Sequence, residues 1–380
     1  MQLQTFPHDR LYIVLAMEKR EEEAMEKAVA LQKEFNHIFK NILYTVHPMQ
    51  KGEIAGKSSN QAYAAREAYP MIIEKHHLDI DFVTITTTDA DAKFDPQYFA
   101  FLAHGFLSSP APHLRIWQSA IVFYNNFWQV PSFTRIMSFF GSLGRTALLL
   151  QKMKLLPHAT YSLSFKLLKD IGYWDADVIP EDYRTFFKAF FATQGKVEVD
   201  PIFLATSMDA AQSATYKSSL VNRYNQERRW AWGVSDVAVY FKWGLTVKGI
   251  SFLRKAYLLI NVLTDHVLWP SYWYIITISA NLVVIFNPVF SRSSLGYTLP
   301  RLSGFILTIC LLSLVGMMYV DYVLQSKRYA SPSKLHRILF PLEFLLMPVA
   351  GFFFSSLPAL ISHIQLIRGK RLEYKVTEKV

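Results

Sequence analysis

The sequence predicts an α/β fold with a mainly parallel sheet, followed by interfacial and transmembrane helices. Three observations lead to this prediction. Between residues 11 and 88, short β-branched or aromatic runs alternate with amphipathic helical patterns, as in a parallel sheet with crossover helices. The last of these runs ends in two carboxylates one residue apart. After residue 268, two stretches are almost free of charge and about as long as a bilayer core requires, roughly 20 residues each.

The individual elements follow from periodicity and from capping residues. Residues 11–16, 42–46 and 82–88 are expected to be buried strands, and residues 20–35 a helix with one apolar face. Ser58 is a candidate N-cap for a helix that runs to Glu67. Further along, the pattern favours a helix after residue 96, strands at 114–124 and 160–165, an amphipathic stretch at 132–150, and helices that begin near residues 180 and 215.

The composition limits the classes of function. Hydrophobic residues make up 51% of the 380 residues, and Lys and Arg outnumber Asp and Glu by 40 to 30, which fits a surface near anionic lipid or a phosphorylated ligand. The single cysteine, Cys310, excludes an internal disulfide and a zinc cluster. The first apolar run, residues 11–17, is too short for a signal peptide and is followed by charged residues, so secretion is not predicted.

Asp89 and Asp91 stand where the third predicted strand stops. Ligands of open α/β sheets bind at the carboxyl ends of the strands, and two oxygen donors at alternate positions suit a hard divalent cation that carries phosphate. Alone, an Asp-x-Asp triplet is more often a solvated turn or a helix cap. Its interpretation as a metal site therefore depends on the rest of the chain.

Two later segments support that interpretation. Glu181 and Asp182 lie in the first turn of a predicted helix, where the alternative is that they compensate the helix dipole. Gln226, Arg229 and Trp230 occupy positions i, i+3 and i+4, so an amide, a guanidinium and an indole share one helix face. That face could bind a phosphate and stack on a sugar. Its alternative is an amphipathic helix with a solvent-reaching Arg and a core Trp.

The C-terminal third has the pattern of a membrane region. Residues 234–268 mix apolar side chains with Lys, Arg, Trp and Tyr, which is typical of helices in a membrane interface. Residues 269–290 and 303–324 are the transmembrane candidates. Asp321 is expected to reach the interface rather than to act as an acid inside the bilayer.

Residues 338–367 are also apolar, but proline and glycine interrupt them at positions 341, 348, 351 and 358. The basic segments on either side are expected to face the cytoplasm. Two full spans return the chain to that side, and a third would place the basic tail outside. We therefore predict a broken, re-entrant or interfacial hairpin for these residues.

Taken in order, these motifs resemble those of the membrane-bound family-2 glycosyltransferases, whose members include cellulose, hyaluronan and chitin synthases. The order is Gly56-Lys57-x-x-Asn60, Asp89-x-Asp91, Glu181-Asp182 and Gln226-x-x-Arg229-Trp230, followed by apolar spans. The resemblance runs from about Leu11 to the C-terminus. It implies a GT-A-type nucleotide-sugar-binding catalytic domain over residues 1–233, interfacial amphipathic helices over 234–268, a membrane region over 269–367 and a cytoplasmic tail over 368–380.

The resemblance also implies roles for particular residues. Asp89 and Asp91 would hold Mg²⁺ or Mn²⁺ on the diphosphate of a nucleotide sugar, and Asp182 would be the catalytic base that takes the proton from an acceptor hydroxyl. The residues that would bind the UDP- or GDP-linked donor are Lys57, Asn60, Asp89 and Arg229, and those that would contact the glycan or lipid acceptor are Gln226 and Trp230. Stabilisation of the leaving diphosphate by a cation and Arg is consistent with this assignment.

The implied activity is inverting sugar transfer for polysaccharide biosynthesis, by a multi-pass protein of the cell membrane whose catalytic domain is cytoplasmic. Membrane lipid and subunits of a synthase complex are the expected further partners, and nucleic acid is not expected. The tail contains Tyr374, Thr377 and Lys379 in an order similar to the Phe-x-Val-Thr-x-Lys gating loop of processive cellulose synthases, with Tyr in place of Phe. Such a loop would close over the donor, and the alternative is a basic juxtamembrane tail.

Two departures from the family pattern keep other interpretations open. Family members usually begin with a strand that helps to hold the nucleotide base, and the first strand here looks like their second, so we expect a fragment or an incomplete donor pocket. Two or so spans are few for threading a polymer, so processive synthesis is not implied. The alternative function is a non-catalytic fragment, a pseudoenzyme or a synthase subunit. An aspartate phosphatase is disfavoured, because Lys93 stands where that chemistry needs a hydroxyl residue.

Overall fold

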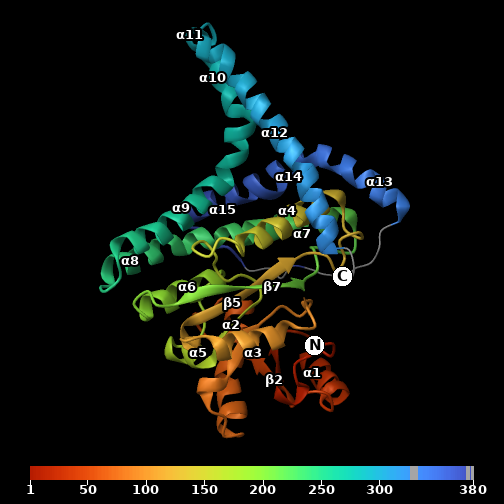
Figure 1. Ribbon diagram of the computed structural model, residues 1–380, viewed down its shortest axis with the longest axis vertical. Coiled ribbons are helices and arrows are strands. Elements are labelled where there is room, and N and C mark those ends of the chain that lie inside the picture. The colour runs from red at the N-terminus through yellow and green to blue at the C-terminus, as the bar shows by residue number, and fades with distance from the viewer. Residues whose placement is uncertain (326–332, 374–376, 378–380) are drawn as a thin grey trace.

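The computed structural model describes residues 1–325, 333–373 and 377, and consists of an α/β domain from which a helical region rises (Figure 1). The N-terminal two thirds of the chain form the α/β domain at the bottom of that view, and α10 and α12 form the projecting hairpin at the top. The predicted fold class, an α/β domain followed by long apolar helices, is confirmed.

Within the described residues, the strands form two sheets. The smaller pairs β1 with β2 in parallel, and the larger has the order β3-β6-β5-β7-β4. The strands are β1 (Tyr12–Glu18), β2 (Asn41–His47), β3 (Thr84–Thr87), β4 (Lys93–Phe94), β5 (Arg115–Val122), β6 (Tyr161–Ser164) and β7 (Glu198–Ser207).

The smaller sheet is parallel, whereas the larger one is mixed rather than mainly parallel. The β5–β7 pair is parallel like β1–β2, but β3–β6, β5–β6 and β4–β7 are antiparallel. Strand direction could not be predicted, because a helical connection between two strands permits either direction. The two-residue β4 and the ten-residue β7 are strands that the pattern did not predict. β7 contains Pro201 and its register with β5 shifts after Ser119, so regular alternation is interrupted there.

Helices cover the sheets of the α/β domain. They are α1 (Ala24–Phe35), α2 (Lys57–Ala68), α3 (Tyr98–Ser108), α4 (Ser132–Leu148), α5 (Phe165–Asp170), α6 (Glu181–Ala192) and α7 (Tyr216–Ala231). The predicted N-cap of α2 is wrong, because Gly56 is the N-cap and Ser58 instead donates its hydroxyl to the carbonyl of Asp175 at 2.6 Å. Thr215 does cap α7, with a reciprocal contact to Ser218.

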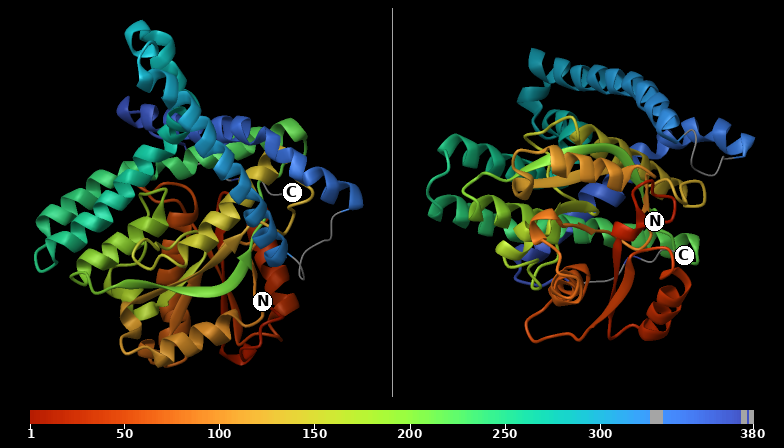
Figure 2. Two further views of the ribbon diagram at one scale, coloured as in Figure 1. Left: turned by 45° about the horizontal axis from the view of Figure 1, so that its top comes forward. Right: turned by 60° about the horizontal axis from the view of Figure 1, so that its bottom comes forward.

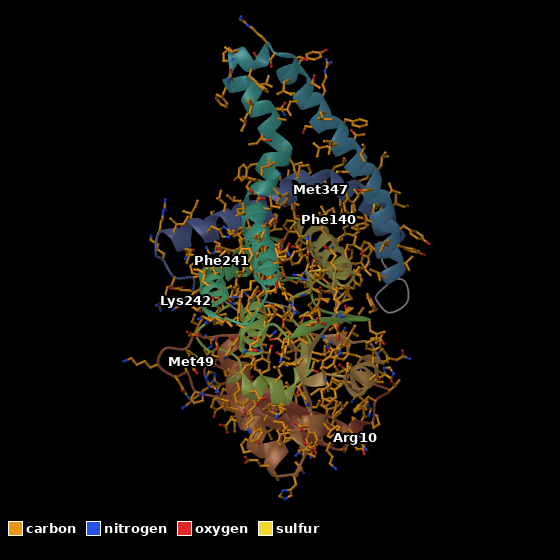
Figure 3. All side chains as sticks on the ribbon, turned by 60° about the vertical axis from the view of Figure 1, so that its left-hand side comes forward. Arg10, Met49, Phe140, Phe241, Lys242 and Met347 are labelled. Atoms are coloured by element: carbon orange, nitrogen blue, oxygen red, sulfur yellow. The ribbon has the colours of Figure 1, made fainter. Side chains whose placement is uncertain are left out.

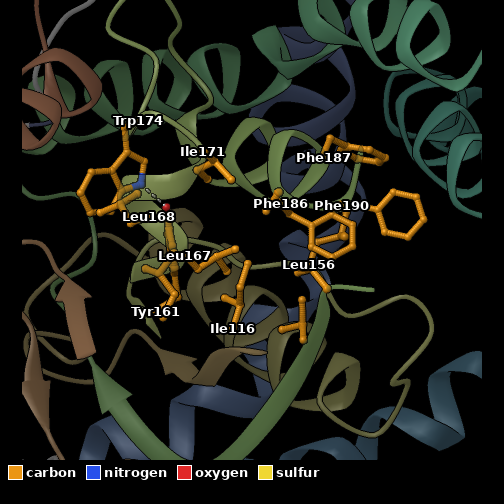
Figure 4. Packing of buried hydrophobic residues seen from close by; sticks show 14 of the residues in the cluster. Ile116, Leu156, Tyr161, Leu167, Leu168, Ile171, Trp174, Phe186, Phe187 and Phe190 are labelled. Atoms are coloured by element: carbon orange, nitrogen blue, oxygen red, sulfur yellow. Dashed lines mark hydrogen bonds between the residues drawn. The ribbon is translucent and has the colours of Figure 1, made fainter. Parts of the chain in front are cut away.

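The largest hydrophobic cluster fixes α6 against the sheet (Figure 4). Phe186, Phe187 and Phe190 of α6 are buried in it. On its far side, the indole N–H of Trp174 donates to the hydroxyl of Tyr161 on β6 at 2.7 Å. Because α6 is held along its length by aromatic packing, the two acids at its first turn have a fixed position relative to β6.

Three helical runs of the described residues are long and apolar enough to cross a membrane: Phe252–Phe286, Ser294–Leu324 and Ile338–Ile367. They belong to a region made of α8 (Val237–Thr246), α9 (Phe252–Tyr274), the π-helical turn η6 (Ile275–Ser279), α10 (Ala280–Phe286), α11 (Pro288–Ser291), α12 (Ser294–Gln325), α13 (Lys334–Glu343), α14 (Met347–Gly351) and α15 (Leu357–Ile367). Figure 2 shows from two further sides that α12 returns toward the α/β domain.

The third run is broken, as its prolines and glycine predicted. A 3₁₀ turn follows α13, a π-helical turn follows α14, and Phe354 leaves helical geometry with φ −117° and ψ 15°. In the most apolar 18 residues of this run, 39% is buried inside the structure, compared with 11% for the first run and 6% for the second. It lies between the hairpin and the α/β domain, and α15 packs on α7 and α9.

Polar contacts join the helical region to the α/β domain. The hydroxyl of Tyr124, beyond the end of β5, donates to the carboxylate of Asp321 on α12 at 2.8 Å. The guanidinium of Arg135 on α4 lies 3.0 Å from the carboxylate of Glu343 on α13, which also accepts from the hydroxyl of Ser132. Asp321 was expected to reach the membrane interface. It lies near the end of α12 and is buried against the α/β domain.

Candidate active site

The predicted site residues converge on one cleft of about 2860 Å³. It runs from the smaller sheet, past the carboxyl end of β3, to the base of the α10–α12 hairpin. The predicted site residues that line it are Lys57, Asn60, Asp89, Asp91, Asp182, Gln226, Arg229, Trp230 and Thr377. Tyr374 and Lys379 lie outside the described residues.

The Asp-x-Asp triplet lies in the segment that connects β3 to β4. These strands form opposite edges of the larger sheet, so residues 88–92 cross over its end. The carboxylate of Asp91 accepts from the backbone N–H of Asp209 at 2.7 Å, and its carbonyl accepts from the amide of Asn125 at 2.9 Å. The crossing segment is therefore bonded to the residues that follow β7 and β5. Asp89 and Asp91 line the cleft.

Lys57 is the cation at the centre of an acidic cluster. It is the first residue of α2, directly after Gly56, whose φ of +141° favours glycine. Its ammonium lies 3.1 Å from Asp89 and 3.4 Å from Glu181. Burial opposes the charge of Lys57, but these two carboxylates outweigh that effect and raise its pKa, so the ammonium stays charged. Glu181 is thus an ion-pair partner of Lys57 in addition to an acid at a helix N-terminus.

Asp182 is held by two backbone donors. One carboxylate oxygen accepts from the N–H of Tyr183 at 2.9 Å, and the other accepts from the N–H of Ala159 at 3.2 Å. The carbonyl of Ala159 in turn accepts from Lys57. Ala159 has a φ of +55°, a costly conformation for a residue other than glycine that is often found at functional sites.

Burial raises the pKa of both neighbouring acids. It lifts the pKa of Glu181 to about 7, even though Lys57 favours the ionised form. Burial also raises the pKa of Asp182, against the opposing effects of Lys57 and of its backbone donors. A carboxylate whose pKa is raised accepts a proton more readily, which is the property that a general base needs.

The shared face of α7 forms the opposite wall of the cleft. Gln226 accepts from the guanidinium of Arg223 at 2.5 Å, and Arg223 also pairs with Glu227. Arg229 donates to the hydroxyl of Thr377 at 2.9 Å, so the tail residue that the structure describes reaches the site. The ring of Trp230 stacks on that of Phe123, with their centroids 6.4 Å apart.

Asn60, one turn after Lys57 on α2, binds the smaller sheet. Its amide donates to the carbonyl of Ala16 at the end of β1 at 2.7 Å. Its amide oxygen is buried and has no hydrogen-bond partner within the part of the chain that the structure describes. Asn60 lines the end of the cleft next to β1, and a buried polar atom without a partner is uncommon in native structures.

The donor set fits a hard divalent cation that also binds phosphate. Among the described residues, no cluster of three or more His, Cys, Asp or Glu side chains could hold a metal alone. Asp89 and Asp91 supply carboxylate oxygens, the ligand type that Mg²⁺ and Mn²⁺ prefer. Two protein carboxylates leave the remaining coordination positions to phosphate oxygens and water.

Sequence reasoning missed one ion pair and one cation of this cleft. The ion pair between Glu181 and Lys57 joins residues far apart in the sequence, so local pattern gives no sign of it. Arg145 of α4 lies over the rings of Phe123 and Trp230, 4.9 and 5.0 Å from their centroids. In the sequence, Arg145 is distinguished only by its position as a cation on the apolar face of residues 132–150.

Buried acids, a charged lysine and arginines gathered around one cleft are typical of sites for phosphorylated ligands. The chain belongs to glycosyl transferase family group 2, whose family model matches residues 84–353, more than half of the chain. This membership agrees with the predicted GT-A-type glycosyltransferase domain. A search of curated proteins gives no match.

Two solved structures are similar in outline. One is the mannosyltransferase PcManGT from Pyrobaculum calidifontis in complex with GDP-Man and Mn²⁺, at 11% identity and a TM-score of 0.49, covering 97% of this chain and 81% of that one. The other is S. aureus TarS 1-349 in complex with UDP-GlcNAc, at 11% identity and a TM-score of 0.43, covering 97% and 86%. TM-scores below 0.5 indicate neither a shared substrate nor a shared mechanism.

Proposed function

We propose that this protein is an inverting glycosyltransferase that moves a hexose from a nucleotide-sugar donor to a glycan or lipid acceptor at the cytoplasmic face of the cell membrane. The observation that carries the proposal is the cluster at the carboxyl end of β3, where Asp89, Lys57, Glu181 and Asp182 meet in one cleft. Family membership supports the reaction class.

In the proposed reaction, the acceptor hydroxyl oxygen attacks the anomeric carbon of the donor as the bond from that carbon to the diphosphate breaks. Asp182 takes the hydroxyl proton, and the nucleoside diphosphate leaves with the bonding electron pair. The backbone N–H groups of Ala159 and Tyr183 hold the carboxylate of Asp182 in position, so little reorganisation of this base is needed. Displacement from the opposite face inverts the anomeric centre.

The cations of the cleft stabilise the leaving diphosphate. Lys57 and Arg229 both line the cleft, and both can donate to phosphate oxygens. Asp89 and Asp91 would hold Mg²⁺ or Mn²⁺, which neutralises charge on the diphosphate when bound. Trp230 offers an aromatic face to the acceptor sugar, and Gln226 is kept in place by Arg223.

Membrane attachment through the hairpin places the cleft at a lipid surface. The first two apolar runs expose most of their side chains, which favours burial in a bilayer. The basic excess of the chain favours the anionic cytoplasmic leaflet. We assign the 338–367 run to the interface, because it is broken and is buried more than the other two.

The test is transfer from a panel of radiolabelled UDP- and GDP-sugars with Mg²⁺ or Mn²⁺, in purified membranes. Asp182→Asn is expected to abolish transfer while nucleotide affinity stays within a few-fold. Asp200→Asn, the same change in an ion pair outside the cleft, is the matched control and should remain active. Asp89→Asn is expected to remove metal-dependent nucleotide binding. Folded wild-type protein that turns over no donor would refute catalysis and favour a pseudoenzyme or a synthase subunit.

A further inference from the structure

The cleft extends well beyond the space that a nucleotide sugar needs. Ligand pockets for small molecules usually measure about 300 to 1,000 Å³, whereas this cleft has about 2860 Å³. Part of its lining comes from α9, η6, α12 and α14, where the hairpin joins the rest of the structure. We call this part the apolar arm, and its lining residues include Trp269, Tyr272, Ile276, Leu307, Cys310, Met347 and Pro348.

The apolar arm has the properties of a hydrocarbon site. From Trp269 to Gly351, the lining residues that the structure describes carry no charge. The indole N–H of Trp269 donates to the hydroxyl of Ser355 at 3.1 Å, and that of Trp273 donates to the carbonyl of Pro348 at 2.8 Å. Because both indole donors are already occupied, the arm offers mostly ring faces and aliphatic groups to an occupant, with Tyr272, Thr277 and Cys310 as its polar side chains.

The arm ends where the hairpin begins. Ile276 and Leu307 belong to the two helical runs that expose most of their apolar side chains. Figure 3 shows Phe140 and Met347, which both line the cleft, one above the other below the hairpin. A molecule that lies in a bilayer around the hairpin can therefore reach the arm from the side.

A cation stands where the apolar arm meets the acidic cluster. Arg145 lines the cleft, and its guanidinium stacks over Phe123 and Trp230. Across the ring of Trp230, Arg223 is paired with Glu227. Within the described part of the chain, Arg145 has no carboxylate within ion-pair distance. Burial lowers its pKa to about 10, so it remains charged at neutral pH.

We propose that the acceptor is a membrane lipid with a phosphate-bearing head group, which binds Arg145 while its hydrocarbon chains occupy the apolar arm. A charged guanidinium on an aromatic platform, with no described carboxylate within ion-pair distance although the charge of Glu227 raises its pKa, suits a phosphate. The lipid enters between the helices at the hairpin base and presents a hydroxyl toward Asp182. This inference rests on the proposed function, because it names the acceptor of that same site.

The test measures lipid retention without any donor. The protein is placed in phosphatidylcholine nanodiscs doped equally with phosphatidic acid and diacylglycerol of identical acyl chains, and retained lipids are counted by native mass spectrometry. Wild type is expected to retain phosphatidic acid about tenfold over diacylglycerol, since a charge-assisted hydrogen bond contributes about that factor or more. Arg145→Met should lose this preference, and Arg145→Lys should recover part of it.

Two further variants separate the parts of the site. Arg254→Met removes a cation of α9 that does not line the cleft, so it should keep the wild-type preference. Cys310→Trp fills the apolar arm and should lower retention of both lipids. Unchanged preference in Arg145→Met would overturn the proposal. So would a tenfold loss of nucleoside diphosphate affinity in Arg145→Met, measured by calorimetry, because it would assign Arg145 to the donor. Since lipid retention needs neither donor nor turnover, failure of the proposed sugar transfer would leave the retention result unaffected.

Discussion

Glutamine in place of Glu181 is expected to stabilise the protein in a pH-dependent way. The carboxyl is buried, and its pKa is about 7 instead of the ordinary 4.5. Ionisation of Glu181 therefore costs the folded state free energy that it does not cost the unfolded chain. The difference corresponds to about 3 kcal/mol. Lys57 keeps its contact with Asp89 in the variant, so the ammonium is not left without a partner.

The sign of this effect follows from the two pKa values. Below pH 4.5 the carboxyl is protonated in both states and the penalty is absent. Between pH 4.5 and 7 the penalty grows, and above pH 7 it is complete. Glu181→Gln removes it, so its free energy of unfolding should exceed that of wild type by about 3 kcal/mol at pH 8 and by almost nothing at pH 4.5.

The assay is thermal unfolding in nanodiscs at pH 4.5, 6 and 8, followed by intrinsic fluorescence. An increase in Tm of several degrees is expected at pH 8. Glu198→Gln is the matched control, because Arg115 lowers the pKa of that carboxyl despite partial burial, so its replacement should not stabilise at pH 8. The reasoning is refuted if Glu181→Gln raises Tm equally at every pH, or lowers it at pH 8.

Three other substitutions test the packing around the cleft by the same unfolding assay. Arg135→Met should cost about 1 to 3 kcal/mol, because it leaves the partly buried carboxylate of Glu343 without its cation, and adding Glu343→Gln should recover most of the loss. Additive losses in the double variant would contradict the pairing. Trp174→Phe should cost about 1 to 2 kcal/mol through the lost hydrogen bond to Tyr161, and no change would show that bond to be unimportant. Gly195→Ala should cost about 1 kcal/mol or more, since φ is +78° and the new methyl would lie 3.2 Å from Ile250, whereas a gain would contradict this conformation.

The order of elements and the gathering of the motifs could be predicted from the sequence. The strand before Asp89 and Asp91 was predictable, and both residues follow β3 and line the cleft, while their role stays a prediction. The i, i+3, i+4 spacing likewise placed Gln226, Arg229 and Trp230 along one cleft wall. Both inferences depend only on local geometry, which the chain encodes within a few residues.

What could not be predicted depends on contacts between distant segments. Strand direction in the larger sheet and the strand β7 are set by pairing, and Pro201 with the adjacent register shift obscures the pattern of β7. The partner of Glu181 is Lys57, more than a hundred residues earlier, so helix-dipole compensation was the simpler interpretation. From the sequence, Arg145 is one cation of an amphipathic helix. Its contacts with the rings of Phe123 and Trp230 could not be predicted, because these residues come from two other segments.

The hydrogen bond between Arg229 and Thr377 means that the cleft is completed only late in synthesis of the chain. Lys57 and Asp89 leave the ribosome early, but Thr377 follows the apolar helices in the chain, 148 residues after Arg229. The wall that α14 and Thr377 contribute can be added only after those helices have been made. A nascent chain therefore presents its acids before the enclosure around them exists. A partly synthesised chain therefore lacks this wall of the cleft until the apolar helices and the tail have been made.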